Sequence, residues 1–254
     1  MAEHQFHTPE PVELDVQIPA GDIRVETVDG TESTVSVTGS ERLVEQTQVS
    51  LEGSRLTIAH KSKKPFGITI SIGDFSFGSD RGLQISAKVP HHSRASLSTA
   101  AADMKLRGRY RSLETKSASG DLTVTGEIEQ DATVKTVSGD VRVDQIGGEL
   151  KVQSVSGDVV VSSVGGSIET RSVSGDVRFD HVREGTVTVQ SVSGDIEVGV
   201  AAGTNLDVDA GSVSGDLSSE VPLGSDPGAG NDGGPTLVVR GKTVSGDFRV
   251  FRAA

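Results

Sequence analysis

Cysteine is absent from the 254 residues of this chain. Disulfide bridges, zinc sites built from thiolates, iron–sulfur clusters and cysteine nucleophiles are therefore excluded. Among the six histidines, the pair His91-His92 follows Pro90 in an expected turn, and no third metal ligand is evident beside it. We expect no metal and no cofactor.

Aromatic residues are also scarce, with seven Phe, one Tyr and no Trp. Valine and glycine take their place, with 35 and 31 residues. A chain rich in Val and Gly but poor in aromatics favours short strands and tight turns over helices.

The sequence lacks a long apolar run and a secretory leader. Its first ten residues contain neither a basic stretch nor an apolar one. No run of 18 uncharged apolar residues occurs, so no membrane-spanning helix is predicted. The expected location is the cytoplasm, and the alternative is the cell surface reached by non-standard export.

Positive charge is scarce in the second half of the chain. Residues 1–116 hold 14 Lys and Arg against 15 Asp and Glu, a net charge of −1. Residues 117–254 hold 10 against 21, a net charge of −11. Phosphates would be repelled by this half, so nucleic acid is not an expected partner.

The tripeptide Ser-Gly-Asp occurs seven times, and six of the repeats follow each other at steps of 18 to 21 residues. The last step is 31 residues long and contains residues 221–235, which we expect to be a flexible insertion. The repeated glycines are Gly120, Gly139, Gly157, Gly175, Gly194, Gly215 and Gly246.

Each repeat divides into two nonapeptides with apolar residues or Thr at positions two, four and seven. One repeat places Val159, Val161 and Val164, then Ile168, Thr170 and Val173, at these positions. Such alternation indicates a strand with one buried face, and the closing glycine supplies a turn.

Stacked repeats of this kind predict an all-β fold. We expect a single-stranded parallel β-helix, or β-solenoid, with coils of 18–21 residues and Ser-Gly-Asp turns. Right-handed coiling is favoured by the general preference of parallel crossovers. The side chains expected inside are Val143, Val161, Phe179, Val189 and Val198.

The chain divides into three parts on this reading. We expect a disordered tail at residues 1–9, an irregular β region at 10–95 that caps or opens the solenoid, and the regular solenoid at 96–254. Short strands are expected within the irregular region at residues 34–38, 55–59, 67–72, 75–77 and 83–89. Phe248, Phe251, Arg249 and Arg252 are expected to cap the last coil.

The segments Leu83-Gln-Ile-Ser-Ala-Lys-Val-Pro90 and Ala95-Ser-Leu-Ser-Thr99, followed by repeated Ser-Val-Ser-Gly-Asp-Val-x-Val, resemble a known family. It is the bacterial β-strand-repeat domain family called "putative adhesin", and the resemblance runs from about residue 20 to the end. It implies a single-stranded β-helix without an established activity or catalytic residues. The family's label also implies an exported or membrane-anchored protein.

A column of aspartates follows the repeated glycines and would stack at coil spacing. Neighbouring carboxylates about 5 Å apart repel by ~1 kcal/mol in water, so something must offset the repulsion. Three explanations are open: capping of backbone amides, bridging by Arg142, Arg178 and Arg249 two residues on, or bound Ca²⁺. Capping is favoured. The column consists of Asp121, Asp140, Asp158, Asp176, Asp195, Asp216 and Asp247.

Two features could carry chemistry. The serine before each glycine repeats in every coil and has no nucleophile-elbow motif, so it is interpreted as structural. Lys105, Arg107, Arg109 and Arg111 alternate and are expected to share one strand face. They form either a solvated strand face or a patch for an anionic partner, for instance the acidic half of a second copy.

The sequence therefore predicts a non-catalytic β-solenoid that acts as a binding or scaffold module. A protein partner or end-to-end self-association is expected. Two alternatives are a β-helix protein that binds or degrades polysaccharide, for which the aromatic platforms are missing, and a calcium-dependent surface adhesin.

Overall fold

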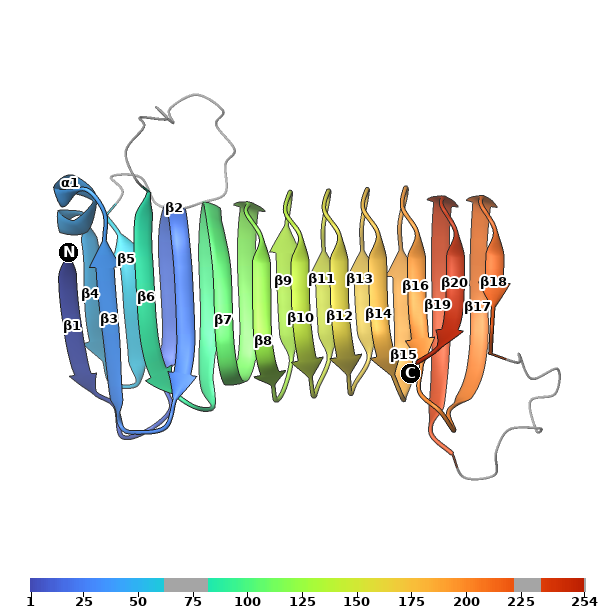
Figure 1. Cartoon of the computed structure of the whole chain (residues 1–254), viewed down its shortest axis with the longest axis horizontal. Helices are drawn as coiled ribbons and strands as arrows, with labels where there is room; N and C mark the ends of the chain where they lie inside the picture. The colour runs from blue at the N-terminus through green and yellow to red at the C-terminus, as the bar shows by residue number, and fades with distance from the viewer. Residues whose placement is uncertain (62–81, 222–233, 254) are drawn as a thin grey trace.

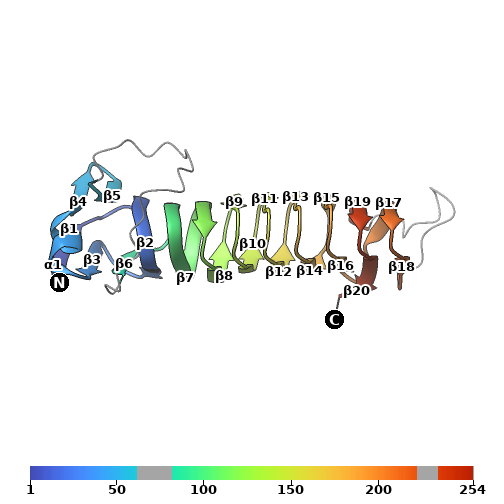
Figure 2. The same cartoon turned by 90° about the horizontal axis from the view of Figure 1, so that it is seen from above.

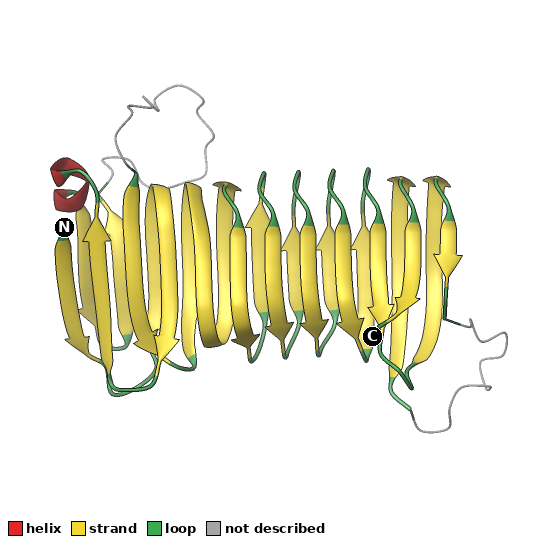
Figure 3. Cartoon of the chain, viewed as in Figure 1, coloured by secondary structure: helices red, strands yellow, loops and turns green. Residues whose placement is uncertain are grey.

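The computed structural model describes residues 1–61, 82–221 and 234–253. Strands dominate these ranges, and the one helix, α1 (Glu41–Glu45), has five residues (Figure 3). No helix in the described ranges is long and apolar enough to cross a membrane. The strands expected at residues 67–72 and 75–77, and most of the insertion expected at 221–235, lie outside the described residues.

The strands form a solenoid with two faces, visible as two rows when it is seen from above (Figure 2). We call the row that follows the Asp turns the Asp face and the other row the opposite face. Apart from two strands that serve both rows, the parallel strands of the Asp face are β6 (Leu83–Pro90), β8 (Leu122–Ile128), β10 (Val141–Ile146), β12 (Val159–Val164), β14 (Val177–Val182), β16 (Ile196–Val200), β18 (Leu217–Ser219) and β20 (Phe248–Arg252). Those of the opposite face are β5 (Arg55–His60), β9 (Ala132–Thr136), β11 (Leu150–Gln153), β13 (Ile168–Arg171), β15 (Gly185–Gln190), β17 (Asn205–Ser214) and β19 (Thr236–Ser245).

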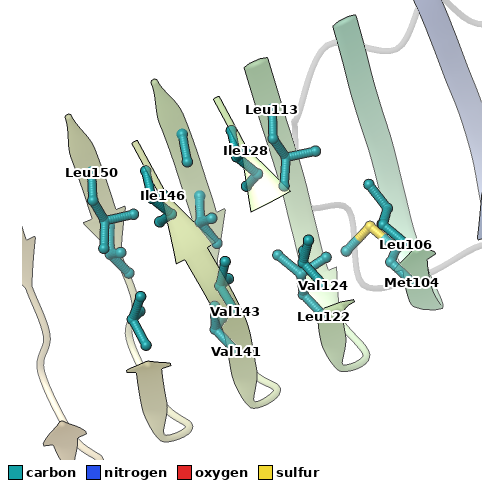
Figure 4. Close-up of a cluster of buried hydrophobic side chains, with 14 of the residues drawn as sticks. Met104, Leu106, Leu113, Leu122, Val124, Ile128, Val141, Val143, Ile146 and Leu150 are labelled. Carbon is teal, nitrogen blue, oxygen red and sulfur yellow. The ribbon is translucent and has the colours of Figure 1, made fainter. Parts of the chain in front are cut away.

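Alternating side chains fill the space between the two faces with Val, Ile and Leu (Figure 4). In the β12–β13 coil, Val159, Val161 and Ile168 point inward and are buried, while the residues between them face outward. The prediction of an all-β solenoid is confirmed. All five side chains expected inside are buried: Val143, Val161, Phe179, Val189 and Val198.

The turn glycines are required by close stacking. Gly157 has a φ of 117°, and a Cβ built on it would lie 2.3 Å from the carbonyl oxygen of Gly139 in the preceding coil. A side chain there would collide with backbone that cannot move aside, so only glycine fits.

One inward assignment is wrong. Val173 was expected inside but is 48% exposed, and the same holds for the valines at its position in neighbouring coils. Alternation from Ile168 and Thr170 continues to Ser172, which is buried, so the next residue faces outward. Position seven of this nonapeptide lies three residues after position four and therefore falls on the outer face. The exposed valines of this corner are Val137, Val155, Val173, Val192, Val213 and Val244.

The amino-terminal region also differs from expectation. Residues 2–7 form strand β1 (Ala2–His7) instead of a disordered tail. It pairs antiparallel with β3 (Glu32–Thr38), which pairs antiparallel with β6, so β1 satisfies backbone groups that β3 would leave at the sheet edge. On the opposite face, β4 (Thr47–Glu52) pairs antiparallel with β5.

Regular stacking begins well before residue 96. Strand β2 (Glu13–Val28) is long enough to serve both faces, and it pairs in parallel with β5, β6 and β7 (Ser93–Ser119). Strand β7 likewise continues around a corner to pair with both β8 and β9. Part of the region expected to be irregular therefore belongs to the solenoid itself.

The coils at the carboxyl end are stacked out of chain order. Strands β19 and β20, the last in the sequence, pair with β15 and β16 on one side and with β17 and β18 on the other. The coil of β17 and β18 is therefore the outermost, as Figure 1 shows. Phe248 and Val250 are buried between coils, so the expectation that this segment caps the solenoid is wrong.

Candidate functional site

The aspartates of the turns form a continuous ladder of hydrogen bonds. The Oδ1 atom of each one accepts the backbone N–H of the aspartate in the next coil, at 2.8 to 3.1 Å. The acceptors, in stacking order, are Asp103, Asp121, Asp140, Asp158, Asp176, Asp195 and Asp247. This is the bonding that the capping interpretation expects, and a carboxylate held in this way has a structural role.

The arginines two residues further on do not bridge the ladder as proposed. Arg142 contacts Asp140 of its own strand at 3.1 Å, while Arg178 pairs with Asp180 and Glu197. Arg249 pairs with Glu197 and Glu220. Most of this positive charge therefore goes to acids outside the ladder, and the repulsion along the ladder is offset chiefly by the backbone amides.

The ladder also offers no clear metal site. Within the described ranges, no three side chains of His, Asp or Glu are placed to hold a metal ion together. The histidine pair has other contacts: His91 Nδ1 lies 2.7 Å from Thr27 Oγ1, and His92 Nδ1 lies 2.5 Å from Glu129 Oε1. We place no functional site in the ladder or at the histidines.

The predicted basic patch lies partly in an open groove on the Asp face. Lys105 and Arg107 project from β7 into this groove, which has a volume of about 330 Å³. Arg24 of β2 lies in register with Lys105, and Glu26 lies in register with Arg107. On the far side of β2, Ser86 pairs with Arg24 and Lys88 pairs with Glu26. We call this surface the basic groove; its charged and hydroxyl side chains are Arg24, Glu26, Ser86, Lys88, Lys105, Arg107, Thr123 and Thr125.

The basic groove contains four cations and one acid. Lys88 Nζ lies 3.9 Å from Glu26 Oε2. Arg24, Lys105 and Arg107 have no acidic side chain within 4.0 Å in the part of the chain that the structure describes. These exposed cations are therefore available to a ligand, in a chain whose net charge is −12.

The other two members of the predicted patch lie beyond the groove. Arg109 continues the same row on β7 and is in register with Glu127 of β8. Arg111 is exposed after the buried Tyr110, where β7 turns toward the opposite face. The prediction that all four share one strand face therefore fits Lys105, Arg107 and Arg109, but not Arg111.

Tyr110 fixes the strand that carries the patch. Its side chain is fully buried, and its hydroxyl donates to the carbonyl oxygen of Val25 at 2.8 Å. Burial raises the pKa of Tyr110 far above its ordinary value. The phenol thus stays protonated and joins β7 to β2, the two strands that hold Lys105 and Arg24.

Sequence analysis missed Arg24 and Lys88 as members of the groove. A signal for Arg24 exists, because Asp22-Ile-Arg24 and Asp103-Met-Lys105 have the same spacing of acid, apolar residue and base, and the strands that contain them are in register. Lys88 has no such signal, since it lies beside β2 only through the pairing of β6.

A second open groove on the opposite face provides a comparison. It has a volume of about 300 Å³ and is lined by Glu149, Lys151 and Glu169, among others. Lys151 Nζ lies 3.6 Å from Glu149 Oε2, so its cation is already paired. The uncompensated positive charge of the basic groove is not a general property of the solenoid surface.

Two solved structures are similar to this chain at low sequence identity. A "putative lipid binding protein" from Parabacteroides distasonis ATCC 8503 has a TM-score of 0.63 and 15% identity, with 98% of this chain and 96% of that chain covered. A "putative adhesin" from Bacteroides fragilis NCTC 9343 has a TM-score of 0.48 and 16% identity, with the same coverage of 98% and 96%. Identities this low bear on the fold alone.

Comparisons of the sequence identify a family but no individual curated relative. No curated protein gives a significant match to the chain. A family model described as Toastrack DUF4097 matches residues 12–251, nearly the whole length. The repeated Asp turns, the two-faced solenoid and this match lead to one conclusion: the chain belongs to the Toastrack DUF4097 family.

Proposed function

We propose that this protein is a non-catalytic binding module that holds an acidic protein partner in the basic groove. The observation that carries the proposal is the set of three cations, Arg24, Lys105 and Arg107, that form no ion pair within 4.0 Å among the described residues. Unpaired cations on a rigid surface attract anions at long range and can pair with carboxylates on contact.

The arrangement of the groove favours a chain of carboxylates over a single small anion. Lys105 and Arg107 are two residues apart on one strand, so their side chains emerge about 7 Å apart. Arg24 projects from the neighbouring strand, about 4.8 Å from Lys105. Three cations spread in two directions are a better match for several acidic groups on an extended polypeptide than for one small anion.

Strand pairing supports a rigid site. Strands β2, β6, β7 and β8 are hydrogen-bonded neighbours, and the side chains beneath the groove are buried. The cations therefore project from a fixed base, and binding costs less conformational entropy than it would if they lay on a mobile loop. The structural neighbour described as a "putative lipid binding protein" is consistent with a binding role.

Poly-L-glutamate of about twenty residues is a suitable probe, measured by fluorescence anisotropy at low salt. The triple variant Arg24→Ala, Lys105→Ala, Arg107→Ala should weaken binding by tenfold or more. The matched control replaces Arg142, Lys151 and Arg171 by alanine, because each of these cations is paired with an acid two residues before it in the chain. The control carries the same change of net charge and should bind nearly as well as the wild type.

Two results would contradict the proposal. One is the absence of binding by the wild-type protein at 20 mM salt. The other is an equal loss of binding in the groove variant and in the control, because net charge alone would then explain the effect. Loss of binding as salt is raised is expected in any case, since exposed charges are screened.

A further inference from the structure

From Asp103 to Asp247, each coil of the solenoid holds the next one at the Asp turn by the same pair of hydrogen bonds, which we call the grip. The carboxylate of the turn aspartate accepts the N–H of the next coil's aspartate. The residue that follows the aspartate donates its own N–H to the C=O of that same next aspartate, at 2.8 to 2.9 Å. In the middle of the molecule, Asp158 Oδ1 and the Val159 amide bond to Asp176. Asp176 Oδ1 and the Val177 amide bond in turn to Asp195.

The outermost coil has the same two groups, and neither has a partner among the described residues. Asp216 and Leu217 occupy the gripping positions in the coil of β17 and β18, as the register of Leu217 with Phe248 shows. The Asp216 N–H and C=O are held by the preceding coil, through Asp247 Oδ1 and the Phe248 amide. Among the described residues, no further coil receives the Asp216 carboxylate or the Leu217 N–H, which alternates away from β20.

The apolar side chains of the same coil are only partly covered. Leu217 is 54% exposed, although its counterparts Phe248 and Ile196 in the two coils inward are buried. Val213 is 82% exposed, the most of any valine at its corner. At Leu217 this edge therefore presents a backbone N–H without a partner among the described residues, together with apolar surface, the combination that binds an added strand.

The charge of the edge selects the kind of strand. Asp207 and Asp209 are exposed on β17, and Asp216 is exposed at the turn. The neighbour that β17 already has, β19, carries Arg240 in register with Asp209 and Lys242 two residues on. A strand with cations at alternate positions would meet the acids from the other side in the same way.

We propose that the open edge of β17 and β18 binds a β-strand of a partner protein that carries basic residues at alternate positions. One residue of that strand gives its N–H to the Asp216 carboxylate and its C=O to the Leu217 N–H, which fixes the register. A second copy of this chain is a poor occupant, because two identical edges would bring Asp207, Asp209 and Asp216 against the same acids. The amino-terminal end offers antiparallel edges at β1 and β4 and no Asp turn.

The probe is a synthetic peptide with the sequence of residues 236–252, the coil that this edge pairs with on its inner side. Its four cations correspond to Arg240, Lys242, Arg249 and Arg252. Binding of the fluorescein-labelled peptide to the full chain is followed by anisotropy. A control peptide with glutamate at the four basic positions should bind at least tenfold more weakly.

Two variants of the protein test the grip. Asp216→Ala removes the acceptor, and Leu217→Pro removes the donor at an edge position where proline is tolerated. Each should weaken peptide binding tenfold or more and leave the melting temperature within about 2 °C of the wild type, because neither group bonds to a described residue. A peptide that merely replaced β19 and β20 would still bind both variants, because those strands do not bond to the Asp216 carboxylate.

The groove variant described above serves as an independent control and should bind this basic peptide as the wild type does. The proposal is overturned if the wild type does not bind the peptide, or if Asp216→Ala binds it unchanged. It is equally overturned if Asp216→Ala unfolds the protein, or if sedimentation shows a wild-type dimer that Asp216→Ala abolishes. In the last case a second copy, and not a basic strand, occupies the edge.

Discussion

The coil of β12 and β13 in the middle of the solenoid and the coil of β17 and β18 at its end follow one repeat but have different surroundings. Asp158 and Val159 bond to the next coil, whereas Asp216 and Leu217 meet no further described coil. The same motif is therefore structural in one place and available in the other. In a stack of this kind the stabilisation belongs to the contact between repeats, not to the repeat alone.

The largest difference between the two coils should come from placing a charge at the position after the aspartate. Val159→Asp buries an unpaired carboxylate among apolar side chains and should lower the free energy of unfolding by about 3–5 kcal/mol. Leu217→Asp changes a half-exposed side chain at the edge and should cost less than about 1 kcal/mol. Urea denaturation of both variants measures the difference, and similar midpoints would remove the basis of the comparison.

A smaller difference is expected from the aspartates themselves. Asp158→Ala removes an acceptor and leaves the Asp176 amide without its partner, so it should cost about 1 kcal/mol. Asp216→Ala should cost nothing measurable. Asp158→Asn keeps an acceptor and should be milder than Asp158→Ala. Equal losses at Asp158 and Asp216 by thermal denaturation would show that the ladder does not act through the next coil.

A still smaller effect should extend the comparison to the other end of the molecule. Burial lowers the pKa of His60 at the end of β5, where its buried Nδ1 has no hydrogen-bond partner among the described residues. Below about pH 6.5 the unfolded chain takes up a proton that the folded chain does not, so stability falls as the pH falls. His60→Gln should reduce the change of melting temperature between pH 7.5 and 5.5. An unchanged difference would refute the assignment to His60.

The smallest expected effect is that of calcium, which should be zero. The ladder carboxylates accept backbone amides, and no group of three ligands is found among the described residues. A native-state ligand would raise the melting temperature. Scans in 2 mM CaCl₂ and in 2 mM EDTA should coincide. A melting temperature ten degrees higher in calcium would show that bound ions, and not the hydrogen bonds of the ladder, distinguish the middle coils from the end coil.

The sequence predicted the solenoid because its repeat carries the local information. The steps between glycines give the coil length, and alternation places Val159 and Val161 inside. It failed at Val173 because this residue lies three positions after the buried Thr170, where alternation places a side chain outside. Strand β1 was missed because its pairing with β3 depends on an edge that the repeat does not encode.

The candidate site was predicted in part for a similar reason. Lys105 and Arg107 are close in sequence, and their alternation on one strand was visible. Arg24 lies 81 residues away from Lys105 and joins it only through parallel pairing of β2 with β7. The open edge was not predicted either, because the last two coils stack out of chain order, which the repeat does not encode.

That stacking order sets a condition on synthesis. The coil of β17 and β18 leaves the ribosome before β19 and β20, yet its strand neighbours among the described residues are those two. The growing stack therefore ends at β15 and β16 until residue 252 has emerged, and the segment from 205 to 219 waits without its native partner. Coils up to β16 can add one by one as they are made, but the last two must assemble together.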